Sequence, residues 1–285
     1  MIDIHQHLIY GVDDGSKDLE MSLAMARMAA ADGVERIVCT PHSNDVYPYQ
    51  ADVINERLAE LRDKLRGEIE LSLGCDFHIT AENVAAATAN PHSFSIDGKG
   101  YLLIEFPNIA LAPGTERVMF ELMSAGYKLV ITHPERYPFV LRSPHYIAQW
   151  MDQGCMLQVT AGALLGKFGP LSEALSLELL DRDWVYFIAT DAHNVDWRPP
   201  NMKAAFDFVA KRKGVETARR LCVVNPRAAV EGRTLGAQPE PIGLWDGVPL
   251  KFRLPGYKPQ RRQQPGDSGV PISDGNSFLK RLFGR

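Results

Sequence analysis

Two histidines stand one residue apart at the end of the first apolar stretch, in the sequence Met1-Ile2-Asp3-Ile4-His5-Gln6-His7. Alternate side chains of an extended strand share a face, so His5 and His7 are expected to project together. Two imidazoles on one face suit a metal ion, but a lone pair at this spacing is also typical of hydrogen-bonded loop histidines. A metal site therefore requires further ligands elsewhere in the chain.

Further His, Asp and Glu residues follow other short apolar runs. With the first pair, the residues at the ends of these runs are His5 with His7, His42, Asp76, Glu105, His133, and Asp191 with His193. They are almost the only charged or imidazole groups that touch the apolar runs. Because an unpaired buried charge is costly, a set of separately satisfied core residues is the weaker explanation.

The elements that must position these residues alternate regularly between strand and helix. Strands are predicted over residues 2–5, 36–40, 69–73, 101–105, 129–132, 156–159 and 184–189. Helices are predicted over residues 18–32, 51–65, 81–89, 114–125, 145–152 and 172–180. Continuous Val, Ile and Leu runs indicate strands buried on both faces, and their alternation with helices indicates a parallel sheet. We therefore predict an α/β fold closed as a seven-stranded barrel, with its chemistry at the carboxyl ends of the strands.

The candidate ligands are imidazoles and carboxylates without a thiolate, which favours Mn, Fe, Zn or Mg over a structural Cys-rich zinc site. Together with Asp14 the set contains five histidines and four carboxylates, too many for one ion. Three divalent ions would leave this pocket positive, which suits a phosphate group and lowers the pKa of a bridging water. The residues thus predict hydrolysis of a phosphoester. Asp13 competes with Asp14, since adjacent side chains point in different directions.

Composition restricts the alternatives. The 285 residues are 45% apolar with a net charge of −4, and residues 251–285 carry eight Lys or Arg against two Asp. The remaining body is therefore acidic, which argues against a nucleic-acid-binding protein. The cysteines Cys39, Cys75, Cys155 and Cys222 show no C-x-x-C spacing and are expected to be buried, reduced thiols. No leader or membrane-length apolar run is evident, so a cytoplasmic protein is expected.

Four motifs occur in order within residues 1–235. They are His5-x-His7 with Asp13-Asp14-Gly15; Thr40-Pro41-His42-x-Asn44; Ile131-Thr132-His133-Pro134-Glu135-Arg136-Tyr137; and Asp191-Ala192-His193-Asn194 with Arg198-Pro199-Pro200. Together they resemble the PHP superfamily, and within it the bacterial manganese-dependent protein-tyrosine phosphatases of capsule and exopolysaccharide loci.

This resemblance implies a distorted barrel of the PHP type that holds three divalent ions, with manganese as the expected metal. The implied ligands are His5, His7 and Asp191 for the first ion, Asp76 as the bridge to the second, Glu105 and His133 for the second, and Asp14, His42 and His193 for the third. It also implies hydrolysis of phosphotyrosine by a metal-bridging hydroxide, without a covalent phosphoenzyme. One position departs from the family, because Asp76 stands where these phosphatases usually have Glu.

The same resemblance places Arg136 and Arg198 at positions that bind the substrate phosphate, and with Asp14 they form the implied catalytic set. A planar guanidinium binds phosphate in a bidentate manner. From the residues alone, an ordinary surface ion pair is an equal alternative for each arginine.

Several nearby residues keep two interpretations. Aromatic side chains that flank the motifs are expected in core or surface packing, or else in a slot for an aromatic ring: Tyr10, Tyr47, Tyr137 and Trp197. His78 could support Asp76, although a loop histidine is the preferred interpretation. His92 and His145 lie outside every motif and are interpreted as structural.

Three other functions compete with a tyrosine phosphatase: a small-molecule phosphatase such as histidinol-phosphate phosphatase, a PHP nuclease, and a non-catalytic metal-dependent binding module. A cysteine-nucleophile phosphatase is disfavoured, because no cysteine begins a C-x5-R loop. Cys222 comes closest, but Arg227 is one residue too near.

The chain is predicted to divide into a metallophosphatase domain over residues 1–248 and a flexible, Pro-rich basic tail over residues 249–285. A helix over the last nine residues would place Phe278, Leu279, Leu282 and Phe283 on one side. The implied partner is a tyrosine-phosphorylated protein, expected to be a membrane-associated tyrosine kinase. The tail is therefore interpreted either as a weak peripheral contact with the inner membrane face or as a solubilising segment.

Overall fold

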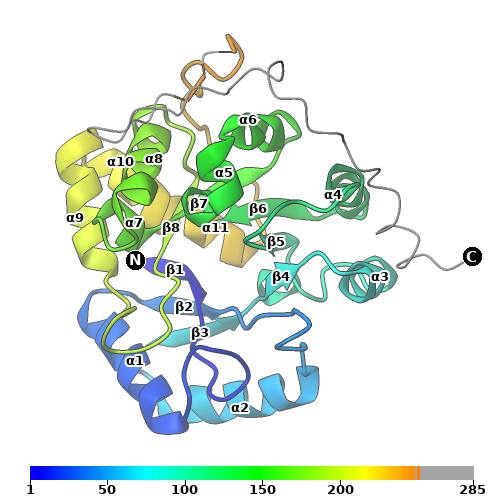
Figure 1. Ribbon diagram of the computed structural model, residues 1–285. Helices are drawn as coiled ribbons and strands as arrows, with labels where there is room; N and C mark the ends of the chain where they lie inside the picture. The colour runs from blue at the N-terminus through cyan, green and yellow to red at the C-terminus, as the bar shows by residue number, and fades with distance from the viewer. Residues whose placement is uncertain (248, 251–285) are drawn as a thin grey trace, which may run out of the picture. The chain divides into compact units, whose positions relative to one another are not determined.

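Parallel strands alternate with helices through most of the chain (Figure 1). The structure, a computed structural model, describes residues 1–247 and 249–250. The strands are β1 (Ile2–Gln6), β2 (Arg36–Cys39), β3 (Glu70–Leu73), β4 (Asp76–His78), β5 (Tyr101–Glu105), β6 (Lys128–Thr132), β7 (Met156–Thr160) and β8 (Phe187–Ala189). The helices are α1 (Leu19–Ala31), α2 (Ala51–Lys64), α3 (Ala81–Ala89), α4 (Thr115–Ser124), α5 (Pro138–Arg142), α6 (His145–Asp152), α7 (Ala161–Leu164), α8 (Pro170–Asp181), α9 (Met202–Lys213), α10 (Val215–Arg219) and α11 (Asn225–Glu231). Short helical turns are η1 (Ile96–Gly98), η2 (Pro134–Arg136) and η3 (Arg220–Val224).

The strands form a three-stranded sheet, β1-β2-β3, and a five-stranded sheet, β4-β5-β6-β7-β8. Two isolated bridges join the sheets, Gln6 with Ala192 and His42 with Asp76. At the first junction the Asp191 N–H donates to the His5 carbonyl over 2.8 Å. The strands therefore close into a distorted barrel, and the predicted α/β fold of parallel strands is confirmed.

The predicted third strand is split in two, so the described chain has eight strands rather than seven. Gly74 and Cys75 separate β3, which pairs with β2, from β4, which pairs with β5. A Cβ at Gly74 would lie 3.1 Å from Val38 Cγ1, so this residue allows a close approach of β2 where the chain passes between the sheets. As a result Asp76 begins a strand of its own, and His78 lies on that strand rather than in a loop.

Alternate faces of the strands pack into two apolar clusters. Leu102, Ile104 and neighbouring outward-facing residues pack against the surrounding helices, in the larger cluster. Leu103 and Val130 belong to a smaller cluster with residues of β1, β2 and β8, which fills the barrel interior. Ala229 and Val230 of α11 complete this smaller cluster, so α11 closes the barrel near the amino ends of the strands. The polar residues are left to the opposite, carboxyl ends.

Local signals account for both ends of α1. The Asp18 carboxylate accepts a hydrogen bond from the Met21 N–H over 2.8 Å and caps α1, and Gly33 follows this helix with a φ of 89°. The strand predicted from residue 184 begins only at Phe187. The Trp184 N–H instead donates to the Leu179 carbonyl over 3.0 Å, so this residue belongs to the turn that caps α8.

The predicted tail lies almost wholly outside the described residues, and the division after residue 248 stays a prediction. Within the part of the chain that the structure describes, no helix is both long enough and apolar enough to cross a membrane. The four cysteines are free and buried, as expected.

Candidate metal centre

A cavity of about 260 Å³ opens at the carboxyl ends of the strands, and it collects most of the residues singled out in the sequence. Its lining includes Asp14, His42, Glu105, His133, Asp191, His193 and both arginines, Arg136 and Arg198. His5, His7 and Asp76 lie buried beneath them, with His5 Nε2 3.3 Å from His7 Nε2. Residues from six separate segments therefore meet in one cluster, as the strand-end pattern predicts.

The turn after β1 folds back on His7 and separates the two adjacent aspartates. A Cβ at Gly15 would lie 2.4 Å from both Cβ and the carbonyl oxygen of His7, so only glycine allows this approach. Asp13 Oδ2 lies 2.7 Å from His7 Nδ1, and its side chain is fully buried. Burial disfavours a protonated His7, but the Asp13 carboxylate outweighs it and raises the pKa of His7 to about 9.

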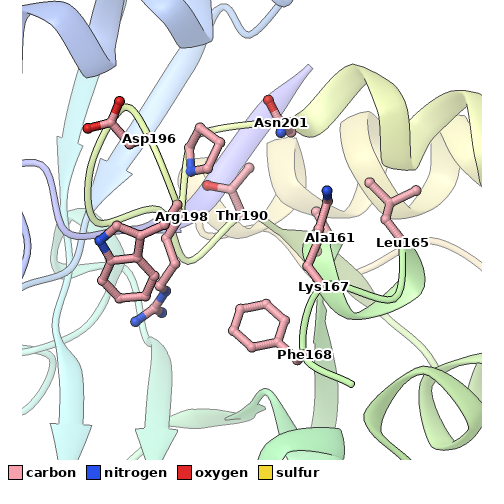
Figure 2. A pocket seen from close by; sticks show the side chains of 11 residues that line it. Ala161, Leu165, Lys167, Phe168, Thr190, Asp196, Arg198 and Asn201 are labelled. Atoms are coloured by element: carbon pink, nitrogen blue, oxygen red, sulfur yellow. The ribbon is translucent and has the colours of Figure 1, made fainter. Parts of the chain in front are cut away.

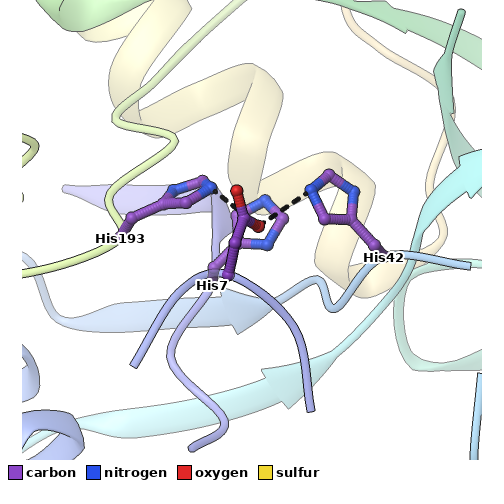
Figure 3. A group of neighbouring side chains, drawn as sticks. His7, His42 and His193 are labelled. Atoms are coloured by element: carbon purple, nitrogen blue, oxygen red, sulfur yellow. Dashed lines mark ion pairs between the residues drawn. The ribbon is translucent and has the colours of Figure 1, made fainter. Parts of the chain in front are cut away.

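Asp14 instead contacts the imidazoles of His42 and His193, which Figure 3 labels. Its Oδ1 lies 3.3 Å from His42 Nε2 and 3.5 Å from His193 Nε2. Burial acts to raise the pKa of Asp14, but the two histidines lower it well below the usual value. His7, Asp14, His42 and His193 can each offer one donor atom within 4.8 Å of the others. The structure thus turns Asp14 into the cluster and leaves Asp13 behind His7.

Asp76 lies at the centre of the cluster and is fully buried. Its Oδ2 is 3.5 Å from His5 Nε2 and 3.3 Å from His42 Nδ1. It belongs to two groups with suitably close donor atoms, one with His5 and His7 and one with Glu105 and His133. A carboxylate shared by two such groups is in the position that a bridging ligand requires.

Glu105 connects three histidines on the side of the cluster formed by β4 and β5. Its Oε1 lies 3.5 Å from His133 Nε2, and its Oε2 lies 3.1 Å from His42 Nδ1. His78 Nε2 also contacts Glu105 Oε2. The sequence-based preference for a loop histidine at His78 was wrong, because β4 directs this side chain at Glu105.

Two of the clustered residues have left-handed backbone conformations, His133 with a φ of 34° and Asp191 with a φ of 51°. Non-glycine residues rarely adopt this region, and such strain is concentrated at functional sites. Both residues follow strands, β6 and β8, so the unusual turns direct these side chains into the cavity rather than along the barrel wall.

Both arginines contact Asp191. Arg136 Nη1 and Arg198 Nη2 pair with Asp191 Oδ2, and Arg198 Nη2 also donates to the Asp191 carbonyl over 2.9 Å. Their side chains are only 23% and 11% exposed, which excludes an ordinary surface ion pair. Burial acts to raise the pKa of Asp191, but the arginines hold it well below its usual range.

Several supporting residues were not predicted. Gln158 Oε1 lies 2.9 Å from His5 Nδ1, and Phe168 places its ring 4.4 Å from Arg136 Cζ and 5.9 Å from Arg198 Cζ. Neither residue stands in a His or Asp motif. Gln158 does, however, occupy an inward position near the end of a predicted strand, which is a usable signal.

The aromatic slot considered for Tyr10, Tyr47, Tyr137 and Trp197 is only partly present. Tyr47 lines the cavity and stacks on His42 at 6.0 Å. Tyr137 is fully buried beside His133, and Tyr10 hydrogen-bonds Glu60. Trp197 is 72% exposed outside this cavity. His92 and His145 pack against Tyr127 and Tyr146, away from the cluster.

The donor set fits divalent metal ions. Among the described residues, the buried atoms His42 Nδ1 and Asp76 Oδ2 have no hydrogen-bond partner, although both lie within the cluster. Imidazole nitrogens and carboxylate oxygens without thiolates suit Mn, Fe, Zn or Mg. An α/β barrel with this centre at its carboxyl ends is the arrangement of a metal-dependent hydrolase.

Comparisons with known proteins give the family. The family described as "Capsular polysaccharide synthesis, CpsB/CapC" matches residues 1–231. Tyrosine-protein phosphatase YwqE of Bacillus subtilis is 33% identical over 243 residues, which cover 84% of this chain and 95% of that protein. The putative tyrosine-protein phosphatase CapC of Staphylococcus aureus is 32% identical, over 73% of this chain and 82% of that protein. The chain belongs to the CpsB/CapC family.

Solved structures agree with this assignment. A structure from the work on YwqE of Bacillus subtilis and CpsB of Streptococcus pneumoniae, described as unique metal-dependent tyrosine phosphatases, has a TM-score of 0.78 at 32% identity. It covers 85% of this chain and 99% of that one. A β-aspartyl dipeptidase from Fervidobacterium islandicum shares the fold alone, with a TM-score of 0.50 at 15% identity over 81% of this chain and 74% of that one.

Proposed function

We propose that this chain hydrolyses phosphotyrosine in a protein substrate at the cluster around Asp76. As a member of the CpsB/CapC family it is a metal-dependent tyrosine phosphatase linked to capsular polysaccharide synthesis. The observation that carries the proposal is the position of Asp76, shared by a group with His5 and His7 and a group with Glu105 and His133. The two arginines face the same cavity.

The groups of donor atoms support an assignment of ligands to three ions. Glu105 and His133 would hold the second ion, with Asp76 bridging, and Asp14, His42 and His193 the third. Asp191 would join His5 and His7 at the first ion, because its Oδ1 lies 3.5 Å from His5 Nε2 and 3.4 Å from His7 Nε2. We propose manganese at these positions, with Fe, Zn and Mg as the alternatives. Bound divalent ions supply a water of lowered pKa and positive charge close to the phosphoryl group.

The side chains of Arg136, Arg198 and Asp14 have separate proposed roles in the reaction. Arg136 and Arg198 present guanidinium groups to the cavity and would bind the phosphoryl oxygens, where charge increases during the reaction. Asp14, the third member of the proposed catalytic set, has a side chain 47% exposed and a pKa held low by His42 and His193. It is therefore ionised at neutral pH, so it can bind a cation or accept a proton but cannot donate one.

A cysteine nucleophile does not fit this molecule. Burial raises the pKa of Cys39, Cys155 and Cys222 to about 12, and it also raises the pKa of Cys75. All four thiols lie in the core and would be protonated at neutral pH. With cysteine excluded as the nucleophile, we propose direct hydrolysis without a covalent phosphoenzyme.

Matched peptides that carry phosphotyrosine or phosphoserine test the proposal. The purified chain would be treated with chelator and then supplied with Mn, Fe, Zn or Mg. Turnover of the phosphotyrosine peptide that is lost with chelator and restored by metal is the expected result. Preference for histidinol phosphate over every phosphopeptide would favour the small-molecule alternative. Absence of metal-dependent turnover on all of these substrates would favour a non-catalytic binding module.

We further propose a membrane-associated tyrosine kinase as the substrate and a cytoplasmic location at the inner membrane face. The support is the family's link to capsule synthesis and the excess of eight basic residues over two acidic ones in residues 251–285. Co-sedimentation with anionic liposomes at low salt would compare the full chain with one ending at Leu250. Equal binding of the two chains would remove the membrane contact.

A further inference from the structure

A second cavity, of about 410 Å³, shares Arg198 with the cavity of the metal centre. Figure 2 shows the side chains that line it. One wall comes from the segment that follows β7, with Leu165, Lys167 and Phe168, and the other from the segment that follows β8, with Trp197 and Arg198. Trp197 is 72% exposed at the rim. Both segments follow strands at the carboxyl end of the barrel, so this cavity opens on the same end of the molecule as the metal centre.

Arg198 is the residue that lines both cavities. Its guanidinium reaches Asp191 in the metal centre, and the Phe168 ring lies 5.9 Å from its Cζ. Only the Arg198 side chain would therefore separate a phosphate bound by Arg198 from the second cavity. An extended peptide advances about 3.3–3.6 Å per residue, so a residue within two positions of the phosphotyrosine reaches across Arg198.

The second cavity combines apolar walls with one amine that has no described ion pair. Lys167 is exposed and makes no side-chain hydrogen bond or ion pair with any residue in the described part of the chain. Figure 2 shows Asp196 on the opposite side of the cavity, with its carboxylate directed away from Lys167. Lys167 therefore presents a positive charge that no described carboxylate neutralises, although residues 1–250 carry a net charge of −10.

We propose that this cavity holds an acidic side chain of the phosphoprotein, within two residues of the phosphotyrosine. The Lys167 amine pairs with its carboxylate, and the Leu165 and Phe168 side chains contact its methylene groups. The inference rests on the proposed function and adds a sequence preference to it. The metal centre removes the phosphate, and the second cavity selects the residues around it.

A peptide series with a non-hydrolysable phosphotyrosine analogue tests this pairing. Glutamate would be placed in turn at each of the two positions before the analogue and each of the two positions after it. A peptide with glutamine at the same position is the neutral match. Fluorescence anisotropy would give Kd for the metal-loaded wild type, Lys167→Met and Lys167→Glu. At one position or more, wild type should bind the glutamate peptide about two- to five-fold more tightly than the glutamine peptide, as expected for a partly exposed ion pair. Lys167→Met should bind the glutamate and glutamine peptides equally, and Lys167→Glu should bind the glutamine peptide more tightly.

Lys211→Met is the matched control, because Lys211 is an exposed lysine near the end of α9 and should keep the ratio. Turnover of p-nitrophenyl phosphate, which is too small to reach the second cavity, should be equal in wild type and both Lys167 variants. A wild type without any glutamate preference, or a preference that survives in Lys167→Glu, would overturn the inference. A protein with the binding preference but no turnover of any phosphopeptide would instead contradict the proposed function.

Discussion

Asp13 and Asp14 are adjacent in the chain but serve opposite sides of the same cluster. Asp13 Oδ2 lies 2.7 Å from His7 Nδ1, behind the ring, whereas Asp14 Oδ1 lies between His42 and His193 in front of it. A carboxylate behind a ligating imidazole fixes its tautomer and orientation. The pair therefore divides into one orienting residue and one proposed ligand.

This division predicts different losses for the two substitutions. Asp13→Ala should keep the ligand set but weaken metal affinity by about 10–100-fold, the usual cost of losing such a partner. Asp14→Ala should lower the number of bound ions. Elemental analysis after gel filtration and Mn titration would measure both, with Asp52→Ala, an exposed aspartate of α2, as the control. Full metal content in Asp14→Ala together with loss of an ion in Asp13→Ala would reverse the assignment.

Replacement of Asp76 should reduce metal binding and activity more than replacement of any other carboxylate in the cluster. Because it is shared by two groups of donor atoms, Asp76→Ala should disturb two ions, whereas His193→Ala should disturb one. We expect kcat/KM to fall by about 100-fold or more in Asp76→Ala and by a smaller factor in His193→Ala. The metal content per protein would show how many ions each variant has lost. The bridging role would be refuted by an Asp76→Ala protein with full metal content and full activity.

Arg136 and Arg198 should affect turnover without removing metal. Each arginine presents positive charge to the cavity, and Asp191 keeps one guanidinium partner when the other is lost. Arg136→Ala and Arg198→Ala should each lower kcat/KM by about 10–100-fold at unchanged metal content, and lysine should restore it only in part. Arg142→Ala, at an exposed position on α5, is the control. Normal kinetics in both alanine variants would exclude phosphate binding by these residues.

Metal binding should release protons at neutral pH. The Asp13 carboxylate raises the pKa of His7 to about 9 in the metal-free protein, so this imidazole is protonated at pH 7. An imidazole that binds a metal ion must be neutral, so metal binding displaces the proton of His7, and metal affinity should increase as the pH rises toward 9. Calorimetric titration with Mn in two buffers of different ionisation enthalpy would count the protons.

Asp13→Ala tests whether the Asp13 carboxylate is the cause of the raised pKa. When this carboxylate is removed, burial should keep His7 neutral at pH 7. The variant should therefore release fewer protons than wild type. Heats that are independent of the buffer in wild type at pH 7 would contradict the raised pKa of His7.

The sequence alone predicted the barrel and most members of the cluster. Its apolar runs end repeatedly in His, Asp or Glu, and parallel strands bring their carboxyl ends together, so order along the chain was enough to predict that His5, Glu105 and Asp191 meet. The motifs around His42, His133 and His193 added the resemblance to a phosphatase family, which the comparisons confirm.

Tertiary structure decided how the side chains are directed. Asp14 rather than Asp13 faces His42 and His193 because Gly15 folds the turn against His7, a contact that no local pattern encodes. His78 reaches Glu105 because Gly74 and Cys75 break one predicted strand into two. Phe168 lies against both arginines although about thirty residues separate it from each of them in sequence. Periodicity predicts which face of an element a residue occupies, but contacts between distant segments arise only when the barrel closes.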